Sequence, residues 1–223
     1  MTTASRELEC SLASDWGIVA GMDEVGRGAL AGPVAVGVAL IGVHAGPVPE
    51  GLTDSKALTP RRRDALVEPI QSWVQDCAVG YASPQEIDRW GIIVALRLAG
   101  RRALAEVASR GLVPGGVLLD GSHDWLSEPD DLFGGIDEPE DPFGVELPVH
   151  MQVKADLSCA VVAAASVLAK VARDRLMTDA DDPGYGWASN KGYGSAAHAR
   201  AIAELGVCDF HRRSWKMPTK PTK

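Results

Sequence analysis

Four acidic residues stand at or just after the ends of short apolar segments, at three separate places in the chain. They are Asp23, Glu24, Asp120 and Asp156. If the apolar segments are strands of one sheet, their acids meet at strand ends, where α/β folds build their sites. Converging carboxylates repel one another, and hard divalent cations such as Mg²⁺ or Mn²⁺ relieve that repulsion through oxygen ligands. Two such ions about 4 Å apart activate water and stabilise the leaving oxygen at phosphorus, so the pattern suits phosphodiester hydrolysis.

Spacing alone leaves a second interpretation open with equal weight. Acids at strand ends often cap the following helix or face solvent, and no spacing shows that the three segments converge. Asp156 also stands two residues before an apolar helix predicted to begin at Ser158, where a negative charge favours the helix N-terminus.

The segments that must position these acids alternate between strand and helix. Strands are predicted from apolar, β-branched runs over residues 17–22, 33–43, 77–82, 116–120 and 148–153. The first two read as a pair joined by a glycine-rich turn. This order of elements predicts an α/β core.

Helices are predicted from capping residues and apolar spacing. One begins at the Thr59-Pro60 pair, with a kink or short break expected at Pro69. A capping box at Ser83 opens a helix that reaches Arg110, continuous or divided, since glycines weaken it. Residues 158–177 predict a buried helix and residues 196–205 a further one. We expect residues 1–180 to form the core and residues 181–223 a helical, basic C-terminal extension packed on it.

The charge distribution is uneven along the chain. The net charge of −8 argues against a nucleic-acid partner, because phosphate binding depends on Lys and Arg. Residues 124–146, however, hold nine acids and no Lys or Arg, so the remainder carries +1. That stretch is rich in Pro and Gly and predicts a mobile surface loop over about residues 124–147. The basic C-terminal end, which includes Arg212 and Arg213, suits phosphate contact and a solvated tail equally well.

The four cysteines are scattered, with no CxxC pair, so they predict neither a zinc site nor a disulfide framework. The first residues lack the apolar run of a secretory signal, and no segment predicts a membrane span. We therefore expect a cytoplasmic chain, and we expect it to be a monomer.

Six blocks resemble the type 2 ribonuclease H family (ribonuclease HII) in order and content. They are GMDEVGRGALAGPVAVGVAL, LTDSKALTPRRRDAL, SPQEID, LLDG, KADLSCAVVAAASVLAKVARDRLM and NKGYGSAAHARAIAELGVCDFHRRSW. Together they cover nearly the whole chain. The resemblance implies a ribonuclease H-like mixed sheet flanked by helices, with a C-terminal helical extension.

The resemblance also implies roles for individual residues. It places the family's metal ligands, for Mn²⁺ or Mg²⁺ and two ions with substrate bound, on the four acids. It places contact with the 2′-hydroxyl side of the ribonucleotide on Gly26, Arg27 and Gly28, and phosphate contact on Ser55 and Lys56. Tyr193 matches the tyrosine that packs on the sugar where ribonucleotide meets deoxyribonucleotide. We expect Lys154 and Arg173 to hold phosphate or pair with the acids.

Glycine suits the 2′-hydroxyl contact because backbone groups approach a sugar closely only where side chains are absent. A tight turn also requires glycine, but it does not explain Arg27. Without the resemblance, Tyr193 reads as a loop or core aromatic and Lys56 as a solvated lysine.

Three positions depart from the family pattern. Ala29 stands where proline is usual, Gly91 where asparagine is frequent, and Ser122 where asparagine commonly follows the aspartate-glycine pair. Each loosens local geometry without removing a metal ligand. The acidic loop also makes the separation of Asp120 and Asp156 longer than is usual.

The expected activity is hydrolysis of the RNA strand in RNA/DNA hybrids and at ribonucleotides embedded in duplex DNA. It would leave 3′-hydroxyl and 5′-phosphate ends and serve ribonucleotide removal in DNA replication and repair. A hybrid-binding protein without catalysis and a phosphatase for small molecules are the alternatives. The complete set of four acids disfavours the first, and the match to a nuclease family disfavours the second.

Overall fold

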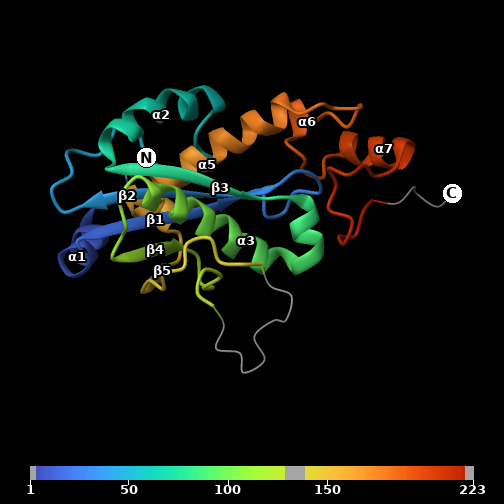
Figure 1. Ribbon diagram of the computed structural model, residues 1–223. Helices are drawn as coiled ribbons and strands as arrows, with labels where there is room; N and C mark the ends of the chain where they lie inside the picture. Colours follow the sequence, from blue (N-terminus) through green and yellow to red (C-terminus); the bar gives the residue numbers. More distant parts are fainter. Residues whose placement is uncertain (1–3, 129–138, 219–223) are drawn as a thin grey trace.

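A five-stranded mixed sheet forms the centre of the protein. The computed structural model describes residues 4–128 and 139–218. The strand order is β3-β2-β1-β4-β5, and helices cover both faces (Figure 1). The strands are β1 Ile18–Val25, β2 Val34–Gly42, β3 Asp76–Ala82, β4 Gly116–Asp120 and β5 Val149–Gln152. All five lie where the sequence predicts strands, so the predicted α/β core is confirmed.

The direction of the strands decides where the acidic residues go. β1 and β2 are antiparallel, as are β2 and β3, whereas β4 runs parallel to β1 and β5 runs parallel to β4. Because β1, β4 and β5 run the same way, their carboxyl ends lie at one edge of the sheet. The three segments that carry the predicted acids therefore leave the sheet side by side.

Helices pack on the two faces of the sheet. They are α1 Glu7–Trp16, α2 Pro60–Trp73, α3 Pro84–Ser109, α4 Ala155–Ser158, α5 Ala160–Asp179, α6 Trp187–Asn190 and α7 Ala196–Leu205, with a 3₁₀ turn at Ser55–Ala57. α2 and α5 cover one face and α3 covers the other (Figure 1).

The helix ends follow the predicted capping signals. Thr59 and Ser83 cap α2 and α3 through their side chains, and the capping box at Ser83 is complete. A kink or a short break is predicted at Pro69; α2 continues through that residue to Trp73, so the helix has no break there. Gly91 has φ +79° and divides α3 at a kink. The short helices α4 and α6, and the N-terminal helix α1, were not predicted.

Small residues let α5 lie directly on the sheet. A Cβ atom added at Gly21 of β1 would meet the backbone carbonyl carbon of Val161 at 2.6 Å. One added at Gly37 of β2 would meet the carbonyl oxygen of Ala165 at 2.2 Å. Since neither backbone can withdraw without moving α5, the glycines set how closely the helix approaches the acid-bearing strand.

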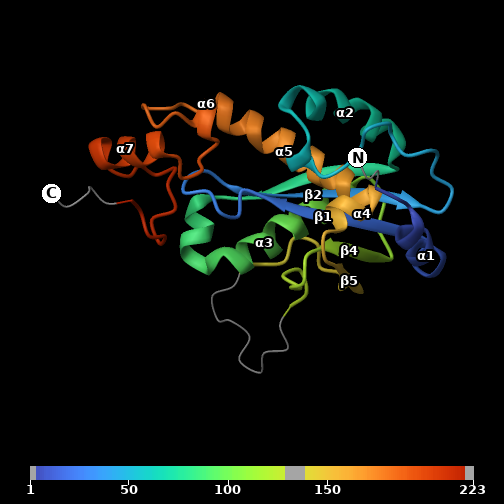
Figure 2. The same ribbon diagram turned by 180° about the vertical axis from the view of Figure 1, so that it is seen from behind.

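The C-terminal segment packs on the far end of α5. A third apolar cluster joins Tyr185, Trp187 and Ile202 of this segment to Ala31 and Met177 of the core. α6 and α7 lie beyond the end of the sheet that is opposite α1 (Figure 2). The division into residues 1–180 and 181–223 stays a prediction.

The predicted acidic loop is described at its two ends, while residues 129–138 lie outside the described residues. Near those ends Arg101 of α3, which is 3% exposed, pairs with Asp141 at 3.1 Å and with Glu146 at 2.7 Å. The C-terminal end of the loop is therefore fastened to α3. In the described part of the chain, no helix is both long and apolar enough to cross a membrane.

Glu9 joins α1 to the start of α5. The side chain is fully buried, and its Oε2 accepts a hydrogen bond from the Val161 backbone N–H at 2.8 Å. Its Oε1 pairs with Arg6 Nε at 3.1 Å. The first amides of a helix have no partner within the helix, so this carboxylate satisfies one of them.

We expect Glu9→Ala to lower the free energy of unfolding by about 2–3 kcal/mol, because it leaves a buried amide without an acceptor and removes the ion pair with the half-buried Arg6. Urea unfolding followed by circular dichroism measures the change. Glu7→Ala, at an exposed site on the same helix, is the control and should change stability little. Equal effects of the two substitutions would contradict this role of Glu9.

Candidate active site

The sheet places two of the predicted acids next to each other. Met22 of β1 is paired with Leu119 of β4 in parallel register. Asp23 and Asp120 each follow one member of this pair, so they stand at neighbouring positions on adjacent strands. Glu24 is the next residue of β1, and its backbone N–H donates to Asp23 Oδ1 at 2.8 Å.

The fourth acid is tied to this pair through the backbone. After β5 the chain turns at Lys154, which has φ +59°, and enters α4 with Asp156 in its first turn. Asp120 Oδ1 accepts hydrogen bonds from the N–H groups of Ala155 at 2.7 Å and Asp156 at 3.4 Å. α4 lies beside the sheet at the start of α5 (Figure 2). The side chain of one predicted ligand thus fixes the peptide that carries another.

Burial and mutual repulsion change the acidity of these groups. Asp23 is 2% exposed, and burial raises its pKa to about 7, helped by the charges of Glu24 and Asp120. Burial also raises the pKa of Glu24, which Arg27 opposes and Asp120 reinforces. Asp23 and Glu24 are consecutive and Asp120 stands beside Asp23 on the adjacent strand, so these three acids lie together.

Asp156 and Lys56 complete the group of charges. Burial raises the pKa of the Asp156 carboxyl, and the charges of Asp120 and Asp54 add to it. Lys56 Nζ lies 3.5 Å from Asp156 Oδ2 and lowers the pKa of both Asp156 and Asp23. One lysine therefore offsets only part of the negative charge, which leaves the site suited to further cations.

The donor set fits hard divalent cations. All four predicted ligands offer carboxylate oxygens, the donors that Mg²⁺ and Mn²⁺ prefer. No three of them bring oxygens within 4.8 Å of one another.

A second acidic group lies elsewhere on the molecule. Carboxylate oxygens of Glu128, Asp141 and Glu146 lie within 4.8 Å of one another. Arg101 pairs with two of these acids, and the group stands beside α3. It is separate from the four acids at the sheet edge.

Ser166 is a site residue that the sequence prediction missed. It is fully buried on α5, and its hydrogen bond to the Asp23 carboxylate lowers the pKa of that group. Its Oγ lies 2.9 Å from Ser55 Oγ. The available signal was a hydroxyl within an otherwise apolar stretch of predicted buried helix, since a buried hydroxyl needs a partner.

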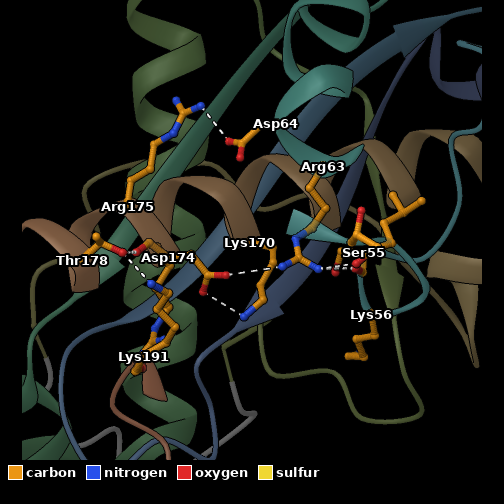
Figure 3. A network of polar contacts seen from close by, with 12 residues as sticks. Ser55, Lys56, Arg63, Asp64, Lys170, Asp174, Arg175, Thr178 and Lys191 are labelled. Carbon is orange, nitrogen blue, oxygen red and sulfur yellow. Dashed lines mark hydrogen bonds and ion pairs between the residues drawn. The ribbon is translucent and has the colours of Figure 1, made fainter. Parts of the chain in front are cut away.

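Ser55 and Lys56 have different surroundings, although they are neighbours. Ser55 is 2% exposed and its hydroxyl faces Ser166, so the predicted phosphate contact by that hydroxyl does not fit its placement. The Lys56 side chain is 72% exposed. Arg63 holds the turn by donating to the carbonyls of Ser55 at 2.9 Å and Leu58 at 2.7 Å (Figure 3).

The glycine-arginine-glycine turn follows directly after β1. Gly26 has φ +86°, a conformation that side chains rarely adopt, and Gly28 is exposed. Arg27 is exposed, and its Nη1 reaches Glu24 Oε1 at 3.4 Å. The turn therefore lies beside Glu24 at the end of β1.

Two arginines that the sequence assigned to the surface or the substrate are buried. Arg173 and Arg212 are both 0% exposed and donate to backbone carbonyls. A phosphate has no access to either guanidinium, which corrects the expected substrate contact by Arg173 and the solvated or phosphate-binding setting of Arg212. Burial lowers the pKa of Arg212 to about 9, so it keeps its charge at neutral pH.

Tyr193 and Lys154 lie in two different loops, Tyr193 beside Arg173 and Lys154 just before α4. The Tyr193 ring is partly exposed, with the Arg173 guanidinium 5.4 Å and Lys170 Nζ 5.6 Å from its centroid. Both cations favour the electron-rich face of the ring. Lys154 is exposed at the turn before α4, at a sequence distance of two from Asp156. These placements keep both available to a substrate.

The family model described as ribonuclease HII matches residues 20–218 of this chain. Ribonuclease HII from Streptomyces avermitilis is 46% identical over 200 residues, covering 89% of this chain and 76% of that protein. Ribonuclease HII from Paracoccus denitrificans is 45% identical over 209 residues, covering 93% and 89%. The fold is similar to the PCNA:RNase HII complex from Archaeoglobus fulgidus, with TM-score 0.62 and 28% identity over 91% of this chain and 97% of that one.

We expect Asp23→Asn to stabilise the metal-free protein. The folded-state pKa of about 7 lies above the ordinary value, so the ionised carboxylate destabilises the fold above pH 7 and the penalty disappears as protonation proceeds toward pH 4. The gain should be on the order of 2–4 kcal/mol at pH 8 and should vanish near pH 4. Thermal unfolding in chelator across this pH range measures it.

Asp15→Asn, at an exposed aspartate of α1, is the control and should leave the pH dependence unchanged. A lower unfolding temperature for Asp23→Asn at pH 8 would contradict the destabilising role of the buried charge.

We expect Ser166→Ala to weaken Mn²⁺ binding by roughly 10-fold, because groups that orient a metal ligand typically contribute 10- to 100-fold to affinity. The affinity falls because Asp23 loses a hydrogen bond that orients its carboxylate and lowers its pKa. Calorimetric titration with Mn²⁺ at pH 8 measures the affinity. Ser189→Ala, at an exposed serine of α6, should bind Mn²⁺ as the unmodified protein does.

Proposed function

The chain belongs to the ribonuclease HII family, whose members cleave RNA in RNA/DNA hybrids, and from this premise we propose that it is a divalent-metal-dependent endonuclease that also cuts at single ribonucleotides in duplex DNA. The main support is the edge of the sheet, where Asp23 and Asp120 stand at neighbouring positions on adjacent strands, Glu24 follows Asp23, and Asp120 accepts from the peptide that carries Asp156. That edge offers four oxygen donors and one nearby lysine. Its remaining negative charge suits Mg²⁺ or Mn²⁺.

The four acids would hold the ions, and the turn at Gly26–Gly28 would meet the sugar. When bound by these acids, two divalent ions would supply an activated water and would neutralise charge at the leaving 3′-oxygen, and cleavage would leave a 3′-hydroxyl and a 5′-phosphate. Asp120 keeps α4 in place by accepting from Ala155, so the peptide carrying Asp156 is positioned before substrate arrives.

Selection of the ribonucleotide falls to groups beside the acids. Gly28 is exposed and no atom lies within 4 Å of where its Cβ would stand, so the backbone there is open to a 2′-hydroxyl, which distinguishes RNA from DNA. The partly exposed ring of Tyr193 offers an apolar face to the sugar that lacks this hydroxyl. Lys56 presents its ammonium group beside Asp156, where it can contact a phosphate.

The cellular role follows from this chemistry. An enzyme that recognises one ribonucleotide in a DNA duplex opens the strand there for its removal during replication and repair. We propose that it acts in the cytoplasm as a monomer.

We expect the purified protein with Mg²⁺ or Mn²⁺ to cut a DNA duplex that carries one ribonucleotide. The cut should fall on the 5′ side of the ribonucleotide and leave the 5′-phosphate on it. Asp120→Asn should lower kcat by at least about 100-fold, since even groups behind a metal ligand contribute 10- to 100-fold. Gel analysis of end-labelled strands measures cutting and identifies the ends.

Glu128→Gln removes an acid of the other acidic group and should leave cutting unchanged. Cutting that persists at full rate in Asp120→Asn would overturn the assignment of the metal ligands. Binding of the duplex without cutting, in any divalent metal, would show a hybrid-binding protein instead.

A further inference from the structure

Two buried arginines enclose the turn that follows β1. Arg212 donates from Nη2 to the Gly26 carbonyl at 2.7 Å, from Nη1 to the Arg27 carbonyl at 2.9 Å, and from Nε to the Gly32 carbonyl at 3.1 Å. One side chain therefore holds both ends of the loop between β1 and β2. Its three bonds span positions that are six residues apart in sequence.

Arg173 of α5 also donates hydrogen bonds to the loop between β1 and β2. It donates to the carbonyls of Pro33 at 2.8 Å, Ala31 at 3.2 Å and Lys191 at 3.0 Å. The last of these belongs to the loop that carries Tyr193, and the Arg173 guanidinium also lies 5.4 Å from the Tyr193 ring. Arg173 thus connects the turn to the tyrosine.

The backbone of the two loops is joined as well. The N–H groups of Leu30 and Ala31 donate to the Gly192 carbonyl at 2.8 Å and 3.2 Å, and Arg212 N–H donates to the Leu30 carbonyl. Close approach explains two glycines here. A Cβ at Gly26 would lie 2.1 Å from Arg173 Nε, and one at Gly192 would lie 2.3 Å from the Ala31 carbonyl oxygen.

The lack of acidic partners makes these arginines unusual. Within residues 4–128 and 139–218, neither guanidinium forms an ion pair with a carboxylate, and each spends its hydrogen bonds on carbonyls. Burying two like charges close together is costly, since Arg173 also lowers the pKa of Arg212. An apolar pair of similar volume would fill the space but could not orient six carbonyls.

We propose that Arg173 and Arg212 are positioning residues that hold the Gly26–Gly28 turn and Tyr193 as one rigid unit, and that this unit determines how well the enzyme recognises a single ribonucleotide in DNA. The inference rests on the proposed function. A lone ribonucleotide offers one 2′-hydroxyl, so the turn must meet it in one position. A full hybrid carries a 2′-hydroxyl on every nucleotide of its RNA strand, so a displaced turn can still meet one of them.

The test compares Arg212→Lys and Arg173→Lys with the unmodified enzyme on two duplexes of equal sequence. One duplex carries a single ribonucleotide and the other an all-RNA strand. Lysine keeps the charge but lacks the planar fork that serves three carbonyls. We expect kcat/KM on the single-ribonucleotide duplex to fall by about 100-fold, the cost of a displacement on the order of 1 Å. The fall on the full hybrid should be at least about 10-fold smaller, as displacement is tolerated there.

Arg175→Lys is the matched control, because Arg175 lies on the same helix but is exposed and pairs with Asp64 at 2.9 Å (Figure 3). It should leave the ratio of the two activities unchanged. Mn²⁺ affinity, measured by titration, should be unchanged in all three variants if the acids keep their places.

The readouts separate the possible failures. An equal loss on both duplexes, which a lower folded fraction produces, would overturn the positioning role, as would an unchanged ratio in the two buried variants. If a lysine variant does not fold, a second measurement takes its place. The rate of hydrogen exchange at the amides of residues 26–28 is compared between Arg173→Gln, which removes the guanidinium, and Tyr193→Phe, which keeps it. Faster exchange in Arg173→Gln alone supports the inference, and equal exchange overturns it. An unmodified enzyme that cuts neither duplex would overturn the proposed function itself.

Discussion

The gathering of like charges in a largely buried place is the constraint that the rest of this structure serves. Asp23 is nearly inaccessible to solvent, and Glu24 and Asp120 add their repulsion to the cost of its burial. Repulsion between these carboxylates by itself favours conformations in which they are farther apart. They stay together because each is attached to backbone that is held for other reasons, in the ladder between β1 and β4 and in the peptide that Asp120 fixes.

The apolar core supplies the rigidity that this arrangement needs. α5 lies so close to β1 and β2 that glycine is required at Gly21 and Gly37. The same helix carries Ser166 beneath Asp23 and receives Glu9 at its first turn. A close-packed helix cannot shift by a fraction of an ångström without creating voids or clashes, so the groups that it carries keep their positions.

The proposed function makes a second demand on the fold, which is to place backbone, rather than side chains, against a substrate. Carbonyl and amide groups of the turn at Gly26 cannot orient themselves, and a glycine-rich loop is intrinsically flexible. Arg173 and Arg212 supply donors from inside the protein, where no water competes for the same carbonyls. In this way the C-terminal segment, which contributes Arg212, helps to build a site whose acids all come from the core.

The amino-acid sequence by itself determined the strands and the longer helices that follow capping residues, because these depend on local patterns of apolar residues and caps. The capping box at Ser83 and the helix over residues 196–205 are of this kind. The sequence also singled out the four acids, but their role as metal ligands is what the resemblance implies and stays a prediction. Only the tertiary structure decided that Arg212 is enclosed rather than solvated, that the Ser55 hydroxyl faces Ser166, and that Arg173 reaches carbonyls on two loops. The reason is physical: a long polar side chain takes its role from partners distant in sequence, and residue type alone does not say which partners the fold will bring within reach.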